Sequence, residues 1–388
     1  MPKQVCLLHI GPQKTGSSAI QRWFADRSLE AEGIFYSKAL GPVSHPFFVS
    51  LFQEYDADSP FTVDTGSRTA EDFSSWKKAK IEEFKEEVRS FRGSGLRFFV
   101  ISHENLARLS PRAVEDVGKT IKPLFDEVVV AGFLRPDAEL ARSWISTHAR
   151  NGKTIGKDFL DRFESGTIDT VRTWNAVFPS ATWIPSRRYR SAIEPFARLL
   201  DLDGERHAPT LRTNERLDFK TAALLAHLKL PRFVGGERNA NRQTYFQDTS
   251  FEAPVQISRA QAMAIQKRHR AWNEEIAAAC SGVELSDLEI DPGDFPETGN
   301  FAVEEEPVYI DRLRETITRL NVQIHLEKCR SNLLLSQLHV ERGQNGKAAE
   351  AHRLATRNLD AAQQARIAAV EPEIGKLRER LDRLRGKL

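Results

Sequence analysis

A glycine-bounded loop near the N-terminus, GPQKTGSS, carries residue types that bind anions. Gly11 and Gly16 have the spacing of a Walker A loop, G-x-x-x-x-G-K-[ST]. The next position is Ser17, however, and the lysine is Lys14, inside the loop. Ser17 and Ser18 add hydroxyl groups where the following helix begins, and its dipole favours negative charge there. The loop predicts an anion site that lysine approaches from a different side than in a nucleotide hydrolase; the alternative is a strand-to-helix turn without a ligand.

The segments around this loop alternate between strand and helix patterns. An apolar run at 4–10 precedes the loop, and apolar residues at helical spacing follow it at 18–30. Residues 76–92 place apolar side chains on one stripe, as in a helix that covers a sheet. Further strands are expected at 97–102, 127–134 and 181–185, with helices after Pro136 and at 190–201. This alternation predicts a three-layer α/β fold with a parallel sheet flanked by helices.

Two other regions lack this alternation. Residues 38–75 and 231–255 are rich in Gly, Pro, Ser and Thr without clear periodicity, so we expect loops or small lids over the site. The residues of an acceptor pocket are expected from 38–75, 146–165 and 231–255. Four aromatic residues could either stack on a sugar or pack in the core, and the sequence does not choose between these roles: Phe47, Phe48, Trp174 and Tyr245.

The composition changes near residue 305, where Glu, Arg, Leu, Ala and Gln begin to dominate. Two heptad runs, beginning at Ile310 and Ile367, predict a C-terminal α-helical coiled-coil extension over 305–388. The segment RGQNG suggests a turn between antiparallel helices, and Pro372 is expected to break or kink the second run at Glu371. We therefore expect an α/β domain over 1–304, with its core at 1–205, and a helical tail. The tail either packs on its own domain or forms a homo-oligomer, and the two alternatives carry equal weight.

The overall composition excludes several classes of partner. The chain has 388 residues with 56 Lys+Arg and 54 Asp+Glu, so its net charge of +2 favours neither nucleic acid nor an anionic membrane. Cys6, Cys280 and Cys329 lie far apart and are odd in number, which indicates reduced thiols in a cytoplasmic protein. No apolar run has the length of a signal segment or a membrane span. Motifs such as H-x-x-H or C-x-x-C are missing from the sequence, so no metal is expected.

The segment HIGPQKTGSSAIQRWF resembles the 5′-phosphosulfate-binding loop of sulfotransferases that use 3′-phosphoadenosine 5′-phosphosulfate (PAPS), especially the bacterial branch with a His-Ile-Gly start. The family pattern is G-x-x-K-[ST]-G-[ST]-[ST], and the serines at 17 and 18 keep the hydroxyls of its usual threonines. The segment VVVAGFLRPDAELARSWIST resembles a second motif of the family, an arginine at a strand end and a serine eight residues later, here Arg135 and Ser143. The resemblance covers residues 1–205, extends in part to 212–228, and implies a P-loop-like fold.

The resemblance implies how the donor is held. Lys14 would neutralise the bridging oxygen as the bond to sulfur breaks, and the loop amides and hydroxyls would hold the 5′-phosphate. Arg135 would bind the 3′-phosphate through its planar fork, although it could instead pair with Asp137 or Glu139. The donor-binding residues implied in this way are Gly11, Lys14, Thr15, Gly16, Ser17, Ser18, Arg135 and Ser143.

The acceptor hydroxyl must lose a proton, so a base is expected beside the donor's sulfur. His103 and Glu104 follow the strand at 97–102, at the edge where open α/β sheets bind ligands. We favour Glu104, because SHENL resembles the S-x-E of bacterial relatives; Glu104 could instead cap a helix or pair with Lys14 or Arg135. The other histidines considered are His9, expected to be packed, and His45 and His148, which nothing supports as a base.

The leading hypothesis is thus a sulfotransferase that transfers a sulfuryl group from PAPS to a hydroxyl of a glycan or another small acceptor. One alternative is a P-loop kinase or nucleotide hydrolase, disfavoured by the position of Lys14 and by the lack of an acidic strand end for Mg²⁺. Another is a non-catalytic sulfotransferase-like scaffold that recruits partners through the helical tail. Neither the acceptor nor the oligomeric state follows from the sequence.

Overall fold

A computed structural model of the chain describes residues 3–150, 158–203, 233–234, 237–238, 255–299, 308–364 and 371–385. The chain divides into two compact units. The first comprises Met1–Trp144, Asp158–Arg216 and Gln256–Asn300, and the second comprises Ile145–Lys157, Leu217–Val255 and Phe301–Leu388. The first unit contains the sheet and the predicted donor motifs, and the second contains the C-terminal helices.

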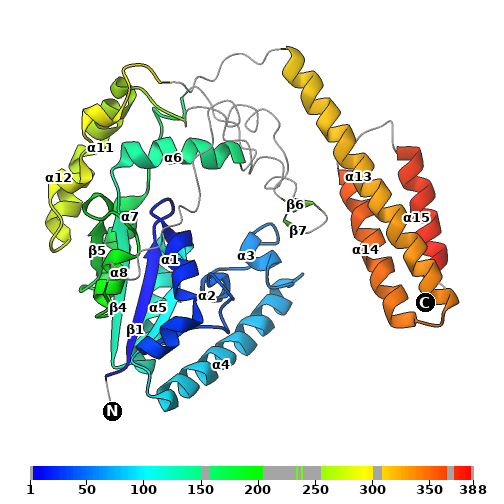
Figure 1. Cartoon of the computed structure of the whole chain (residues 1–388), viewed down its shortest axis with the longest axis horizontal. Helices are drawn as coiled ribbons and strands as arrows, with labels where there is room; N and C mark the ends of the chain where they lie inside the picture. The colour runs from blue at the N-terminus through cyan, green and yellow to red at the C-terminus, as the bar shows by residue number, and fades with distance from the viewer. Residues whose placement is uncertain are drawn as a thin grey trace. The chain divides into compact units, whose positions relative to one another are not determined.

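The first unit is built on a five-stranded sheet whose strands are all parallel and follow the order β2-β3-β1-β4-β5 (Figure 1). The four strands that the sequence predicts are present, and β2 is an edge strand that the sequence did not reveal. Central β1 pairs with β3 and β4, so the segments that follow these three strands meet at one edge of the sheet. The strands are β1 (Val5–Gly11), β2 (Ile34–Tyr36), β3 (Phe98–Ser102), β4 (Glu127–Leu134) and β5 (Thr182–Pro185).

Helices cover both faces of this sheet, which confirms the predicted α/β class. On one face, alternate residues of β1 such as Leu8 pack with Phe84, Val117 and Trp174 of three helices. On the other face, Leu7 and its neighbours pack with α1 and α8. Near-continuous burial of β1 and β3 follows from this double cover. The covering helices are α1 (Ser17–Phe24), α4 (Ala70–Ser94), α5 (Pro111–Ile121), α7 (Thr167–Val177) and α8 (Glu194–Leu199), and α6 (Asp137–Arg150) follows β4.

The region 38–75, expected to be loop, contains more regular structure than its pattern indicates. Two short helices, α2 (Pro46–Leu51) and α3 (Pro60–Val63), each begin with a proline, and α4 starts at Ala70 within this region. Side-chain caps explain the last two helix starts, because the Ser59 hydroxyl accepts from Phe61 N and the Thr69 hydroxyl accepts from Asp72 N. Helices of four to six residues are too short to show a period. Most of the second expected loop, 231–255, lies outside the described residues.

The last part of the first unit packs against the sheet's helices. It contains α11 (Arg259–Ala279), α12 (Leu285–Leu288) and a 3₁₀ turn at Pro292–Asp294. A capping box between Ser258 and Gln261 starts α11.

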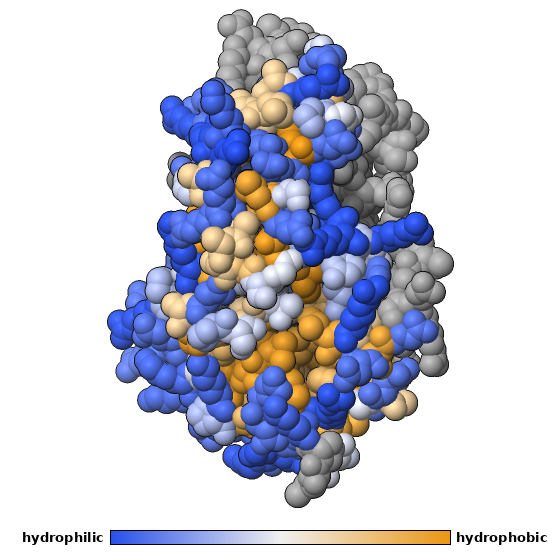
Figure 2. Space-filling model, turned by 90° about the vertical axis from the view of Figure 1, so that its left-hand side faces the viewer, coloured by the Kyte–Doolittle hydropathy of each residue, from blue (hydrophilic) through white to orange (hydrophobic). Residues whose placement is uncertain are grey.

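Hydrophilic side chains cover most of the molecular face that Figure 2 shows, and apolar side chains gather in the lower half of that view.

The second unit contains the C-terminal helices that the sequence predicts: α13 (Val308–Glu341), α14 (Asn345–Gln364) and α15 (Glu371–Arg385). Helices α13 and α14 run antiparallel, since Ser336 contacts Ala348 while His325 contacts Asn358. The predicted turn between them is present at residues 342–344, and Gly343 there has φ +66°. The core that α13, α14 and α15 share includes Leu326, Leu333, Leu359, Leu377 and Leu381. Pro372 lies in the first turn of α15, where its missing N–H costs no helix bond.

The unit also contains a two-stranded antiparallel ladder of β6 (Phe233–Val234) and β7 (Glu237–Arg238). Across the residues that the structure describes, no helix is both long and apolar enough to cross a membrane.

Candidate functional site

The loop between β1 and α1 has an unusual backbone. Gly11 has φ +94° and Gly16, the residue before α1, has φ +93°. Lys14 also has a positive φ, 70°, a region that costs a side-chain-bearing residue roughly 1–3 kcal/mol. A non-glycine residue persists in such a conformation only where its surroundings impose it. The strained residue of this loop is thus Lys14, whose ammonium is expected from the family resemblance to neutralise the bridging oxygen of the donor.

Gly11 brings the loop into direct contact with the segment that follows β3. A Cβ atom at Gly11 would lie 2.8 Å from the main-chain oxygen of Glu104 and 2.9 Å from its Cα, closer than real Cβ contacts. Only glycine therefore permits both this approach and the positive φ. The sheet supports the same contact, because His103 N donates to His9 O at 3.1 Å. The loop and Glu104, 93 positions apart in the sequence, are adjacent in the fold.

The hydroxyl groups near the loop differ in their surroundings. Thr15 is buried and its Oγ1 donates to Pro12 O at 2.6 Å, so this hydroxyl fixes the loop. Ser17 is also buried and its Oγ lies 3.4 Å from the same oxygen, a weak hydrogen bond. Ser18 is half-buried in the first turn of α1, where Ala19 N and Ile20 N already donate to Gly16 O. The amides that this turn offers to a ligand are therefore those that precede Ala19. Donors for an anion are thus the amides of this turn and the hydroxyls of Ser17 and Ser18.

Glu104 is held by a residue that the sequence reasoning missed. Gln21 on α1 donates from Nε2 to Glu104 Oε2 at 2.9 Å, and Gln21 is buried. Burial alone would raise the pKa of Glu104, but the nearby His103, the hydrogen bond from Gln21 and a backbone hydrogen bond outweigh it. The pKa of Glu104 is therefore lowered from its ordinary value. Its carboxylate is ionised at neutral pH and able to accept a proton. The signal for Gln21 was its place four residues after Ser17, on the buried face of α1.

His103 is constrained by its position as the cap of a short 3₁₀ helix. Its Nδ1 accepts a hydrogen bond of 3.0 Å from Asn105 N, and its ring meets Phe61 edge-on at 5.7 Å. Because Nδ1 accepts from this amide, the proton of the neutral ring lies on Nε2, so neither ring nitrogen is available to take a proton from an acceptor. This geometry favours Glu104 over His103 for the role of the base that the sequence led us to expect.

Two other histidines lie in the core under the site. His9 is fully buried, its Nδ1 lies 2.7 Å from Ser102 Oγ, and burial lowers its pKa to about 3. His45 is equally buried and accepts from Ser102 N through Nδ1 at 3.0 Å, with its pKa lowered by burial to about 3. Both are neutral packed side chains, as expected for His9. His148 lies near the end of α6.

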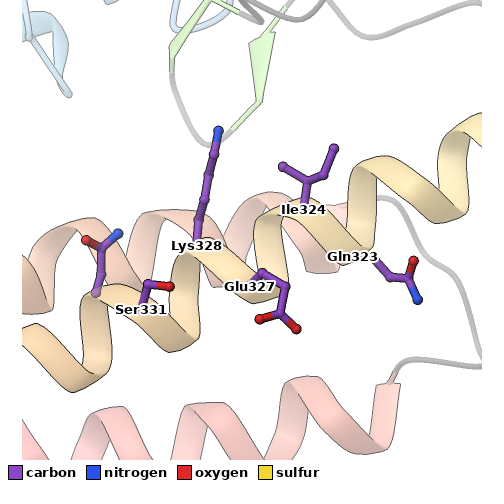
Figure 3. A pocket seen from close by; sticks show the side chains of 6 residues that line it. Gln323, Ile324, Glu327, Lys328 and Ser331 are labelled. Atoms are coloured by element: carbon purple, nitrogen blue, oxygen red, sulfur yellow. The ribbon is translucent and has the colours of Figure 1, made fainter.

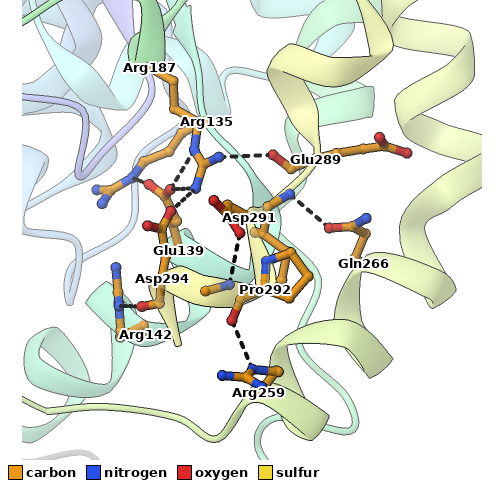
Figure 4. Close-up of polar contacts among 12 residues, drawn as sticks. Arg135, Glu139, Arg142, Arg187, Arg259, Gln266, Glu289, Asp291, Pro292 and Asp294 are labelled. Carbon is orange, nitrogen blue, oxygen red and sulfur yellow. Dashed lines mark hydrogen bonds and ion pairs between the residues drawn. The ribbon is translucent and has the colours of Figure 1, made fainter. Parts of the chain in front are cut away.

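Arg135 follows β4 and contacts the loop after β1. Its Nη1 donates to Lys14 O at 2.6 Å. Its Nε donates to Glu139 Oε2 at 2.7 Å, a contact that Figure 4 shows. The pairing of Arg135 with Glu139, one of the alternatives for this residue, is thus present, and it coexists with the contact to the loop. The other partner considered, Asp137, instead lies 2.6 Å from Nδ1 of buried His269. Ser143 is one helical turn beyond Glu139 on α6 and is half-buried.

The structure thus brings Lys14, Glu104 and Arg135 to one edge of the sheet, from the segments that follow β1, β3 and β4. Within the described ranges, no group of three or more His, Cys, Asp or Glu side chains is arranged to hold a metal ion.

An open surface depression lies on α13, and none of the predicted site residues is among the residues that line it. Figure 3 shows Ile324 and Lys328 on one side of that helix and Gln323 and Glu327 on the other. We assign no ligand to this open surface, because the residues that line it form no convergent polar group. Comparisons with models of protein families, with curated proteins and with solved structures find no match for the chain.

Proposed function

We propose that this chain is a sulfotransferase of P-loop-like fold that transfers the sulfuryl group of PAPS to a hydroxyl of a glycan or another small acceptor. The observation that carries the proposal is the convergence of three charged residues from separate motifs. Arg135 bonds to the backbone of Lys14 at 2.6 Å, and Gly11 of the same loop rests on Glu104. The resemblance of the loop and of the arginine motif to sulfotransferases supplies the donor.

The proposed donor site fits the groups that the loop offers. The 5′-phosphate of the donor would accept hydrogen bonds from the first amides of α1 and from the hydroxyls of Ser17 and Ser18. Lys14 would stabilise the negative charge that develops on the oxygen between phosphorus and sulfur as the S–O bond breaks. Thr15 would keep the loop in shape through its bond to Pro12 rather than contact the donor.

Glu104 would accept the proton of the acceptor hydroxyl as its oxygen bonds to sulfur, and the spent donor would leave as the 3′,5′-bisphosphate. The carboxylate is ionised, and Gln21 fixes its orientation, so little reorganisation is needed before the reaction. Arg135 and Ser143 would hold the 3′-phosphate, which distinguishes this donor from other adenine nucleotides.

We further propose a cytoplasmic protein whose tail forms a coiled coil and holds copies of the chain together. All three cysteines are buried free thiols, which fits a reducing compartment. The exposed leucines of α13, at positions 334, 335 and 338, could supply an oligomer seam.

The test is calorimetric titration with 3′-phosphoadenosine 5′-phosphate, the spent donor, and with ATP in the presence of Mg²⁺. We expect the bisphosphate to bind more tightly than ATP and to bind less tightly to Arg135→Ala. Arg188→Ala is a matched control, because Arg188 is engaged by Asp287 at a different place. Preference for ATP and Mg²⁺ would refute the proposal in favour of a kinase. Donor binding without transfer to any hydroxyl would instead identify a scaffold.

A further inference from the structure

A second arginine, Arg187, shares the carboxylate that pairs with Arg135. Its Nε donates to Glu139 Oε1 at 2.8 Å, while Arg135 Nε donates to the other carboxylate oxygen at 2.7 Å (Figure 4). One carboxylate therefore bridges two guanidinium groups. No motif in the sequence indicates this partnership, since Arg187 stands in an unremarkable run, SRRYR.

The sheet accounts for the position of both arginines. Leu134 of β4 and Pro185 of β5 are register partners in neighbouring parallel strands. Arg135 comes one residue after the first and Arg187 two residues after the second, so both lie at the carboxyl edge of the sheet. This is the edge where the loop after β1 also ends.

Both guanidinium groups are also held from their other sides. Arg187 donates from Nη2 to Asp294 at 2.6 Å and from Nη1 to Glu289 O at 3.2 Å. Arg135 is fixed by Lys14 O. Glu139 thus lies between two positive groups whose positions other contacts maintain.

The three side chains are largely shielded from water. Their exposed fractions are 17% for Arg135, 11% for Glu139 and 27% for Arg187. Burial alone would raise the pKa of Glu139, but the charge and hydrogen bond of Arg135 and the contacts of Arg187 lower it. Shielded ion pairs of this kind are a poor way to stabilise a fold, because desolvation cancels much of the attraction. A cluster of this type beside an anion site therefore calls for another use.

We propose that the carboxylate of Glu139 occupies the place of the donor's 3′-phosphate, and that Arg187 is a second arginine for that phosphate. This inference rests on the proposed function. A phosphate dianion offers three oxygens and two charges where the carboxylate offers two oxygens and one charge, so it binds a pair of guanidinium forks more strongly. On donor binding, the Glu139 side chain rotates away and both arginines bind the phosphate.

The test compares two nucleotides that differ only in the 3′-phosphate, 3′-phosphoadenosine 5′-phosphate and adenosine 5′-phosphate, in calorimetric titrations. For Arg187→Ala we expect the bisphosphate to bind roughly tenfold to a hundredfold more weakly, with the monophosphate unchanged. Arg187→Lys keeps the charge without the fork and should fall in between, and Arg188→Ala should match the wild type. Thermal melts followed by circular dichroism confirm that each variant is folded.

Glu139→Gln provides a test with the opposite sign. Because it removes the internal anion, the bisphosphate should bind several-fold more tightly while the monophosphate is unaffected. Unchanged or weaker binding of the bisphosphate to this variant would overturn the inference, as would equal losses for both nucleotides in Arg187→Ala. If the wild type prefers ATP or binds neither adenosine phosphate, the proposed function fails and the inference with it. If the wild type selects the bisphosphate and only the variants disagree, the inference alone fails.

Discussion

Arg135 donates a hydrogen bond of 2.6 Å from Nη1 to the main-chain oxygen of Lys14, 121 positions away in the sequence. The two motifs that resemble donor-binding segments are therefore joined directly, and a change at Arg135 disturbs the loop as well as the arginine site. Arg135→Ala should accordingly weaken the binding of both the bisphosphate and the monophosphate. Arg187→Ala should weaken only the bisphosphate, which separates support of the loop from contact with the 3′-phosphate.

Gly11→Ala should destabilise the fold and abolish donor binding. Its Cβ would meet Glu104 at 2.8 Å, and its φ is positive, so we expect a loss of about 2 kcal/mol or more in the free energy of unfolding. Urea titration followed by circular dichroism measures this loss. Gly66→Ala is the control: Gly66 has φ +75° but open space around it, so only the backbone cost of about 1 kcal/mol applies. Equal losses in the two variants would mean that the contact with Glu104 is unimportant.

Lys14→Gly should separate stability from activity. Glycine adopts a φ of 70° without strain, so the variant should unfold at the same urea concentration as the wild type or at a higher one. Sulfuryl transfer should nevertheless be lost, because the ammonium is gone. Lys14→Ala should lose transfer as well while keeping the strain, and it should be no more stable than the wild type. A marked drop in stability for Lys14→Gly would show that the lysine serves the fold instead.

Glu104→Gln should slow turnover far more than it weakens binding of the spent donor, since the amide cannot take a proton. Its effect on stability should also depend on pH. Because the pKa of Glu104 is lower in the folded protein than in the unfolded chain, its ionised carboxylate stabilises the fold at pH values above the unfolded pKa, near 4.5. This stabilisation is lost as the pH falls through the folded pKa. The difference in unfolding free energy between wild type and variant should be constant above about pH 5 and should shrink below about pH 4. A difference that does not change with pH would contradict the lowered pKa.

Gln21→Met should shift the acid limb of the pH profile of turnover to higher pH. The hydrogen bond from Gln21 helps to keep the pKa of Glu104 low, and methionine fills a similar volume without donating. Gln13→Met is the matched control, because Gln13 donates to Asn105 rather than to Glu104. A profile recorded for both variants against the wild type decides the role of Gln21 as a positioning residue. An unshifted limb in Gln21→Met would remove the glutamine from the mechanism.

The sequence predicted the strands, helices and loops that depend on a local pattern of residues. The strands at 97–102 and 127–134 are continuous apolar runs, and the loop at Gly11 stands between a strand and a helix, so their order and class followed from the residues. Contacts between distant segments did not follow. Gln21 reaches Glu104 across 83 positions and Arg187 reaches Glu139 across 48, and both pairs meet because of sheet register and helix packing.

The conformation of single residues was equally hidden. A lysine at a positive φ has no signature in composition or period, and α3 is too short to show one. Caps such as Thr69 could have been recognised, since a threonine with acidic residues two and three positions later is a common helix start.

Leu333→Ala should destabilise the tail without affecting the donor site. Leu333 is fully buried in the core shared by α13, α14 and α15, so its truncation should cost roughly 2–5 kcal/mol within that bundle. Its neighbour Leu334 is 60% exposed, and Leu334→Ala should change stability by no more than about 0.5 kcal/mol. Thermal melts show the first effect, and light scattering shows whether Leu334→Ala lowers the oligomeric state, as the proposed seam requires. Calorimetric binding of the bisphosphate should be the same in both variants, because the motifs that hold it belong to the other compact unit. Loss of donor binding in Leu333→Ala would mean that the tail contributes to the donor site, and it would contradict the proposal that the first unit alone holds the donor.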